Sequence, residues 1–285
     1  MIKLFACDLD GTLLNVFHNP DAYILGVIRE ITNGGGHVAI ATGRTMRTPY
    51  DHGFNGLPIE LLGSSGTIVR GRDGELLKSF PIDPAALEEM LQAFPAVCFD
   101  CVAPDGTFVT GSRAEREAGF RNRNPVMHVI MRGMRGRRAT QDSMVFNASV
   151  GQVLAHEICK INCHIPDPGL NREFALYLSE HTDKLLDAPF QPTMFEISDA
   201  HANKATGVAW LAQYLGIAED EVAVYGDGGN DVLMLERFRH SYAPSNASDA
   251  AKEAAGTMLG HFATYSVSRH MRRTFRQEHS RITIA

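Results

Sequence analysis

The sequence lacks the features that would place it in a membrane or direct it out of the cell. No stretch approaches the roughly 20 consecutive apolar residues that a membrane-spanning helix needs. The N-terminus shows no positively charged segment followed by an apolar one, which is the pattern of a secretory signal. We therefore expect a cytoplasmic protein that makes no use of a membrane.

Positive charge is also scarce. The chain has 27 Lys and Arg against 33 Asp and Glu, for a formal net charge of −6. Such a balance gives no general basic field for nucleic acid, so we expect no nucleic-acid partner. Two segments are locally basic, MRGMRGRR at 131–138 and RHMRRTFRQEHSR at 269–281. Solvated surface is the favoured interpretation of both, and an anion-binding role is the alternative.

Cysteine is too scarce, and odd in number, for a disulfide framework. Five Cys in a chain of this length indicate reduced thiols and again favour the cytoplasm. Cys98 with Cys101, and Cys159 with Cys163 and His164, could be drawn as a zinc site. However, both groups lie in apolar, strand-like runs, where side chains three residues apart point to opposite faces. Buried structural cysteines are therefore the favoured interpretation.

The order of elements predicts an α/β protein. Residues 2–7 have the pattern of a buried strand, 21–32 that of a helix with one apolar face, and 37–42 that of a second buried strand. A strand, helix and strand in this order favour a doubly wound, mostly parallel sheet, which binds ligands at the carboxyl ends of its strands. A chain of 285 residues is also long enough for two domains.

The pattern of predicted helices and strands changes near residue 83. Asp83 and Pro84 form a helix start, and the two apolar runs on either side of the Pro-Asp-Gly sequence at 104–106 predict a β-hairpin. The alternation of strands and helices resumes after a Pro-rich linker at 187–192. We therefore predict an α+β cap domain at 83–190, inserted into a core formed by 1–82 and 191–285.

Four short motifs carry the chemistry. They are Asp8-Leu9-Asp10-Gly11-Thr12, Ala41-Thr42-Gly43-Arg44, Lys204 at a helix start, and Gly226-Asp227-Gly228-Gly229-Asn230-Asp231. Alone, the two acids of the first motif could cap a turn, Thr42 could end a strand, and Lys204 could be a solvated helix residue. Their order and spacing resemble the haloacid dehalogenase (HAD) superfamily, and within it the Cof-type hydrolases with a type IIB cap.

Crowded carboxylates need a compensating cation. Mg²⁺ prefers oxygen ligands and commonly uses one or two carboxylates together with substrate phosphate. Asp8 and Asp227 are the first candidates to bind it, and Asp231 is a further one. The resemblance adds the backbone carbonyl of Asp10.

The resemblance also implies the roles of the other site residues. Asp8 would be the nucleophile that forms an aspartyl-phosphate, and Asp10 the general acid and base. Thr42 and Lys204 would stabilise the transferring phosphoryl group, and Thr12 would hold Asp10 by a local hydrogen bond. Asp231 would support Lys204 or the waters around the metal. The remaining implied phosphate-binding residues are Leu9, Gly11, Gly43, Arg44 and Asn230.

This chain departs from the family pattern at two places. Gly63-Ser64-Ser65-Gly66 stands where the family often has Asn-Gly, and Ser65 is a partial substitute for that substrate contact. His201-Ala202-Asn203 is a less typical approach to Lys204.

The function implied by this resemblance is a Mg²⁺-dependent phosphatase of a small phosphorylated metabolite. Sugar phosphates are the first candidate substrates and phosphorylated cofactors the second. Arg113, Arg121 and Arg123 of the cap could reach an anionic substrate, although surface positions are favoured for them. A phosphomutase of the same superfamily and a non-catalytic sensor of phosphorylated ligands are the alternatives.

Overall fold

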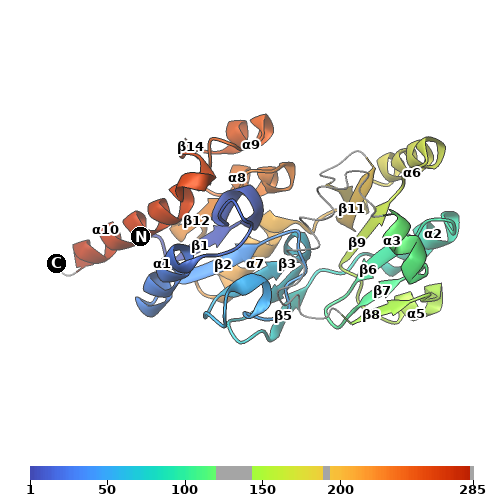
Figure 1. The fold of residues 1–285 in the computed structure, drawn as a ribbon, viewed down its shortest axis with the longest axis horizontal. Coiled ribbons are helices and arrows are strands. Elements are labelled where there is room, and N and C mark those ends of the chain that lie inside the picture. The colour runs from blue at the N-terminus through green and yellow to red at the C-terminus, as the bar shows by residue number, and fades with distance from the viewer. Residues whose placement is uncertain (120–142, 189–192, 283–285) are drawn as a thin grey trace. The chain divides into compact units, whose positions relative to one another are not determined.

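The computed structural model describes residues 1–119, 143–188 and 193–282 of the chain (Figure 1). They form two compact units, the first made of residues 1–78 and the chain from Asn203 onward, the second of residues 79–202. The second unit therefore starts earlier and ends later than the boundaries 83 and 190 expected from the sequence. Arg121, Arg123, the basic segment 131–138 and the linker residues 189–192 lie outside the described residues.

The first unit contains an eight-stranded sheet in the order β14-β13-β12-β1-β2-β3-β4-β5. The strands from β14 to β3 run parallel, and β4 is antiparallel to β3. This arrangement confirms the predicted α/β class. The strands are β1 (Leu4–Cys7), β2 (His37–Ala41), β3 (Glu60–Gly63), β4 (Ile68–Arg70), β5 (Leu76–Ser79), β12 (Val222–Tyr225), β13 (His240–Ala243) and β14 (Thr257–Met258).

Helices of the first unit begin and end where local chemistry predicts. The side chain of Asp21 accepts hydrogen bonds from the amides of Tyr23 and Ile24 and so caps α1. Gly35 follows this helix at φ +85°, a conformation that suits glycine. The helices are α1 (Ala22–Asn33), α7 (Lys204–Tyr214), α8 (Val232–Arg237), α9 (Asp249–Ala254) and α10 (Ser266–Ile282).

The second unit is built on a mainly antiparallel six-stranded sheet in the order β10-β11-β9-β6-β7-β8. The predicted hairpin is present, because β6 and β7 pair antiparallel. Cys101 and Cys163 pack in the apolar core of this unit. The strands are β6 (Phe99–Val102), β7 (Thr107–Val109), β8 (Met144–Phe146), β9 (Lys160–His164), β10 (Leu185–Asp187) and β11 (Met194–Asp199). The helices are α2 (Pro84–Ala93), α3 (Arg113–Gly119), α5 (Val150–Leu154) and α6 (Pro168–Glu180).

Strand β11 explains the later boundary. Its residues follow the linker, so the sequence placed them in the first unit. In the structure β11 instead pairs antiparallel with β9 and β10 of the second unit. An apolar strand pattern does not identify the strand with which it pairs, so this assignment needed the structure.

The sheet of the first unit brings the predicted motifs to one edge. β1 lies between β12 and β2, and all three strands are parallel. Their carboxyl ends are therefore neighbours. Along the chain, successive strands are added on one side of β1 up to β5 and then on the other side from β12, and ligands bind in such sheets at the point where this order reverses. Among the helices described, none has both the length and the apolar character needed to cross a membrane.

Candidate active site

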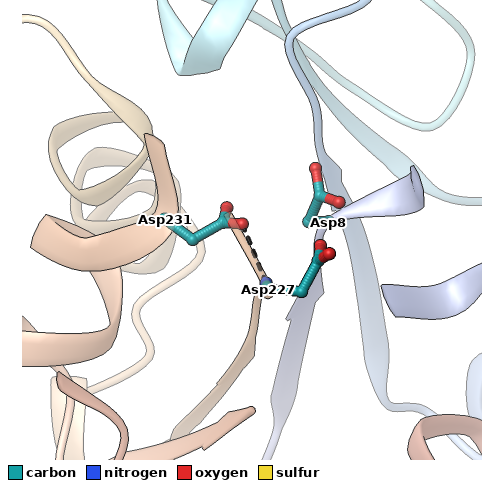
Figure 2. A group of neighbouring side chains, drawn as sticks. All are labelled: Asp8, Asp227 and Asp231. Atoms are coloured by element: carbon teal, nitrogen blue, oxygen red, sulfur yellow. Dashed lines mark hydrogen bonds between the residues drawn. The ribbon is translucent and has the colours of Figure 1, made fainter. Parts of the chain in front are cut away.

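Three carboxylates meet at the carboxyl ends of β1 and β12. The parallel register pairs Cys7 with Tyr225, and the amide of Asp8 donates to the carbonyl of Tyr225 at 2.9 Å. One carboxylate oxygen from each of Asp8, Asp227 and Asp231 lies within 4.8 Å of the other two. Figure 2 shows Asp8 and Asp227 beside each other, with the carboxylate of Asp231 directed toward them. The structure thus gathers the acids that the first and fourth motifs supply.

Lys204 places one positive charge among these acids. Its Nζ lies 2.7 Å from Oδ1 of Asp8 and 2.6 Å from Oδ1 of Asp231, and the residue is 1% exposed. Lys204 is the first residue of α7, where a cation is unfavourable for the helix dipole. The two carboxylates offset that cost. The predicted support of Lys204 by Asp231 is thus a direct ion pair in the structure.

A strained turn after β3 holds the start of α7. Ser64, Ser65 and Gly66 have φ values of +53°, +62° and +85°. A Cβ atom on Gly66 would lie 2.7 Å from the Cα of Lys204, so the backbone can approach α7 only with glycine there. The amide of Ser65 donates to the carbonyl of Thr42 at 2.8 Å. The stretch that departs from the family pattern therefore positions Lys204, and a substrate contact by Ser65 stays a prediction.

Asp231 also orders the loop that carries Asp227. Its Oδ2 accepts hydrogen bonds from the amides of Asp227 at 3.0 Å and Gly228 at 2.9 Å. Both of its oxygens are thus already in hydrogen bonds to the protein. Asn230 lies half-buried in the same turn.

Thr12 binds a different acid from the one expected. The sequence predicts a local hydrogen bond from Thr12 to Asp10, but the Thr12 hydroxyl donates to Oδ1 of Asp227 at 2.8 Å. The reason is long-range: β1 and β12 are adjacent strands, so the loop after β1 reaches the loop after β12. Gly11 adopts φ +79°, and a Cβ atom there would lie 2.2 Å from Oδ2 of Asp227. Gly11 is therefore needed to leave room for that carboxylate.

Asn246 is a residue that the motif analysis did not single out. Its Nδ2 donates to the carbonyl of Gly11 at 2.9 Å, and its Oδ1 accepts from the amide of Phe262 at 3.1 Å. It ties the loop after β1 to the segment before α10. Asn246 lies in the sequence Pro-Ser-Asn-Ala at 244–247, and nothing in that sequence indicates a contact with a residue 235 positions away.

The carboxylate of Asp10 lies outside the group of three acids. Arg44 donates to it from both Nε, at 2.8 Å, and Nη2, and Nδ1 of His18 lies 2.8 Å from Oδ1. Arg44, predicted to bind phosphate, is thus engaged with Asp10 here. Thr42 is buried and its Oγ1 accepts from the amide of Arg44 at 3.1 Å. No residue that the structure describes accepts a hydrogen bond from this hydroxyl, so its proton is available to donate.

Burial and charge set the pKa values of these acids. Burial raises the pKa of Asp8 to about 7, with Lys204 opposing the rise and Asp231 and Asp227 adding to it. Burial also raises the pKa of Asp227 to about 6. For Asp10, burial acts in the same direction, but Arg44 and His18 together outweigh it and the pKa is lowered. Burial would lower the pKa of Lys204, yet Asp231 and Asp8 outweigh it and hold the pKa well above its ordinary value.

Known proteins share this sequence pattern and this fold. A family model described as haloacid dehalogenase-like hydrolase matches residues 5–270. An HMP-PP phosphatase of Citrobacter koseri is 24% identical over 279 residues, or 94% of each chain. A solved HAD-like hydrolase from B. subtilis has a TM-score of 0.78 at 22% identity and covers 95% of this chain and 99% of its own. The HAD subclass IIB sugar phosphatase BT4131 gives 0.73 at 17% identity, with 95% and 98% covered.

Proposed function

The chain belongs to the haloacid dehalogenase-like hydrolases and is a phosphoric monoester hydrolase, and we propose that it uses Asp8 and Mg²⁺ to dephosphorylate a small metabolite. The observation that carries this proposal is the cluster of Asp8, Asp227 and Asp231 around Lys204. Three carboxylates and one ammonium leave two uncompensated negative charges, which one divalent cation would balance.

The residues fit a magnesium ion. Oδ1 of Asp8 and Oδ1 of Asp227 accept hydrogen bonds from Lys204 and Thr12, whereas their Oδ2 atoms accept none from the residues that the structure describes. Hard oxygen donors of this kind are the ligands that Mg²⁺ prefers. We assign Asp8 and Asp227 as its carboxylate ligands, with the carbonyl of Asp10 as the third protein group by family resemblance. Asp231 then orients Lys204 and the Asp227 loop. When bound, Mg²⁺ neutralises charge on the transferring phosphoryl oxygens.

In the first step a carboxylate oxygen of Asp8 attacks the phosphorus atom. A P–O bond forms to Asp8 as the bond to the leaving alcohol breaks, which gives an aspartyl-phosphate. Carboxylates are weak nucleophiles, so the rate depends on positioning and on nearby positive charge. Lys204 contributes both, because its ammonium touches Asp8 and is buried. Thr42, with the amides of Leu9, Gly11 and Gly43, donates hydrogen bonds to the phosphoryl oxygens, and Asn230 orients one of these oxygens.

In the second step water attacks the phosphorus of the aspartyl-phosphate and frees Asp8. Asp10 protonates the leaving alcohol in the first step and takes a proton from this water in the second. Its present hydrogen bonds to Arg44 favour the charged form. Asp10 must therefore leave Arg44, at least in part, to carry a proton to the alcohol. In this proposal Arg44 controls the protonation state of Asp10.

The family and its relatives support a proposal for the substrate class. The named activities of two proteins similar to this chain, an HMP-PP phosphatase and a sugar phosphatase, concern small phosphorylated molecules. We propose sugar phosphates as first substrates and phosphorylated cofactors as second, chosen by the inserted unit at 79–202. We also expect the enzyme to work in the cytoplasm, where thiols such as its five cysteines stay reduced.

A panel of phosphorylated metabolites, assayed for phosphate release with and without Mg²⁺, tests this function. We expect release that needs Mg²⁺, differs among leaving groups and is lost in Asp8→Asn, which keeps the size of the side chain. A protein that binds these compounds without releasing phosphate would instead be a sensor. Transfer of phosphate within a sugar, without release from an aryl phosphate, would indicate a mutase.

A further inference from the structure

The first unit has a pocket of about 430 Å³ whose lining includes none of the catalytic residues. It lies between the first turns of α10 and the segment that precedes this helix. Its volume is within the range of small-molecule sites, roughly 300 to 1,000 Å³. We propose that this pocket is a second binding site, for a small anion with a phosphate or carboxylate group. The lining residues are Leu259, Gly260, Ser266, Arg269, His270 and Arg273.

Two uncompensated arginines carry this proposal. Arg272 and Arg276 on α10 form ion pairs with Glu30 of α1. Arg269 and Arg273 are exposed, lie one helical turn apart in the pocket lining, and form no ion pair with any residue in the described ranges; Arg269 donates a hydrogen bond to Oγ1 of Thr264 at 3.1 Å. A pair of guanidinium groups on one wall matches the oxygens of phosphate or carboxylate, and a bound anion would balance their charge.

His270 adds a polar ring to the pocket lining. Its Nδ1 lies 3.0 Å from the hydroxyl of Tyr225, which is fully buried and whose pKa is raised well above its ordinary value, mainly by that burial. The hydroxyl thus stays protonated, and when it donates to Nδ1 the imidazole proton sits on Nε2. Burial and Arg273 lower the pKa of His270 to about 4, so the ring stays neutral and contributes a hydrogen bond rather than a charge.

The segment that precedes α10 is held in place by hydrogen bonds within the protein. The hydroxyl of Ser266 donates to the carbonyl of Gly260 at 2.6 Å. Two residues further on, the amide of Phe262 donates to Asn246, which in turn bonds Gly11 of the catalytic loop. A preformed wall lowers the entropy cost of binding. The pocket is therefore preformed within the first unit, and hydrogen bonds through Asn246 connect its segment before α10 to the loop after Asp8.

Calorimetric titration with inorganic phosphate tests the second site. Wild type is compared with Arg269→Ala/Arg273→Ala at constant ionic strength, with Arg29→Ala/Arg239→Ala as the matched control. Arg29 and Arg239 are exposed and lie outside the pocket, so the control loses the same charge without touching the site. We expect wild type and control to bind phosphate at this site. The pocket variant should not bind phosphate there, or should bind it at least tenfold more weakly. Phosphate binding by the pocket variant that is indistinguishable from wild type would overturn the proposal.

Nuclear magnetic resonance of the histidine rings gives a second measurement. The resonances of His270, assigned by their loss in His270→Gln, should move when phosphate is added to wild type and stay in place in the pocket variant. If they do not move in wild type, His270 does not line an anion site and the proposal is wrong. The difference between wild type and the pocket variant, like the His270 resonances, reports binding at α10, so the outcome does not depend on whether Asp8 carries out catalysis.

Discussion

The ammonium of Lys204 lies 2.7 Å from Oδ1 of Asp8, and both side chains are almost fully excluded from solvent. This ion pair ties the start of α7 to the end of β1 across 196 residues of sequence. Its removal leaves Asp8 and Asp231 as buried acids without their cation. The pair therefore matters for stability as well as for chemistry.

Lys204→Met should destabilise the metal-free protein. Loss of one partner of a buried ion pair costs about 3 to 5 kcal/mol of unfolding free energy, because the remaining charge is uncompensated. The loss should be smaller at pH 5 than at pH 8, since Asp8 can take up a proton. Urea unfolding at both pH values measures it. Lys252→Met, at an exposed pair with Asp249, should change stability by less than about 0.5 kcal/mol. Equal stability of Lys204→Met and wild type at pH 8 would contradict the ion pair.

Gly11→Ala should abolish the metal site by displacing Asp227. Gly11 and Gly35 both have positive φ values, +79° and +85°. Alanine at either position should lower the free energy of unfolding by roughly 1 to 2 kcal/mol, because the left-handed backbone is unfavourable for a residue with a Cβ atom. Only at Gly11 would the new Cβ meet Asp227, at 2.2 Å from Oδ2, while at Gly35 nothing lies within 4 Å. Gly11→Ala should lose Mg²⁺ binding and activity, whereas Gly35→Ala should lose only stability. Normal Mg²⁺ affinity in Gly11→Ala would count against the proposed ligand set.

Stability of the metal-free protein should fall as pH rises from about 4 to about 7. Burial raises the pKa of Asp8 to about 7 and of Asp227 to about 6, from 3.8. In that window the folded state holds protons that the unfolded chain has lost, so their stabilisation is present at low pH and disappears as pH rises. Mg²⁺ needs both groups deprotonated.

The increase in melting temperature on adding Mg²⁺ should therefore be larger at pH 8 than at pH 5. Differential scanning calorimetry with and without the metal measures this increase. Asp227→Asn removes one proposed ligand and should show a much smaller increase at pH 8. An increase that is the same at both pH values in wild type would exclude Asp8 and Asp227 as the ligands.

Arg44→Met should move the pH profile of kcat/KM. Burial would raise the pKa of Asp10, but Arg44, with a smaller effect of His18, lowers it, so removal of Arg44 should raise that pKa. Asp10 must be protonated to give a proton to the leaving alcohol. The basic limb of the profile should therefore shift to higher pH. Arg29→Met, on the exposed face of α1, serves as control and should leave the limb in place. An unchanged limb in Arg44→Met would mean that Asp10 is not the acid.

The fold and the main acids were accessible from the sequence because both depend on local patterns. Apolar strands that end in polar residues predicted β1 and β2. Parallel strands put their carboxyl ends on one edge, so Asp8 and Asp227 could be expected to meet. The family model confirms the resemblance on which the proposed roles rest. The roles of individual residues stay predictions until they are measured.

The features that the sequence missed are all contacts between distant segments. The sequence predicts a bond from Thr12 to Asp10, its neighbour in sequence, but Thr12 bonds Asp227 in the loop after β12. The bond of Asn246 to Gly11 and the ion pair of Asp10 with Arg44 join separate loops in the same way. Side-chain type limits which partners are chemically suitable, but the fold decides which one is within reach.

Identification of the residue that carries the phosphoryl group tests the central claim most directly. Wild type is quenched during turnover of p-nitrophenyl phosphate with Mg²⁺ and treated with sodium borohydride, which reduces an acyl phosphate to the alcohol. Peptide mass spectrometry then locates the reduced side chain. Our account predicts homoserine at position 8 and at no other acid, only when both substrate and Mg²⁺ are present. Turnover that leaves Asp8 unmodified while another residue is reduced would contradict it.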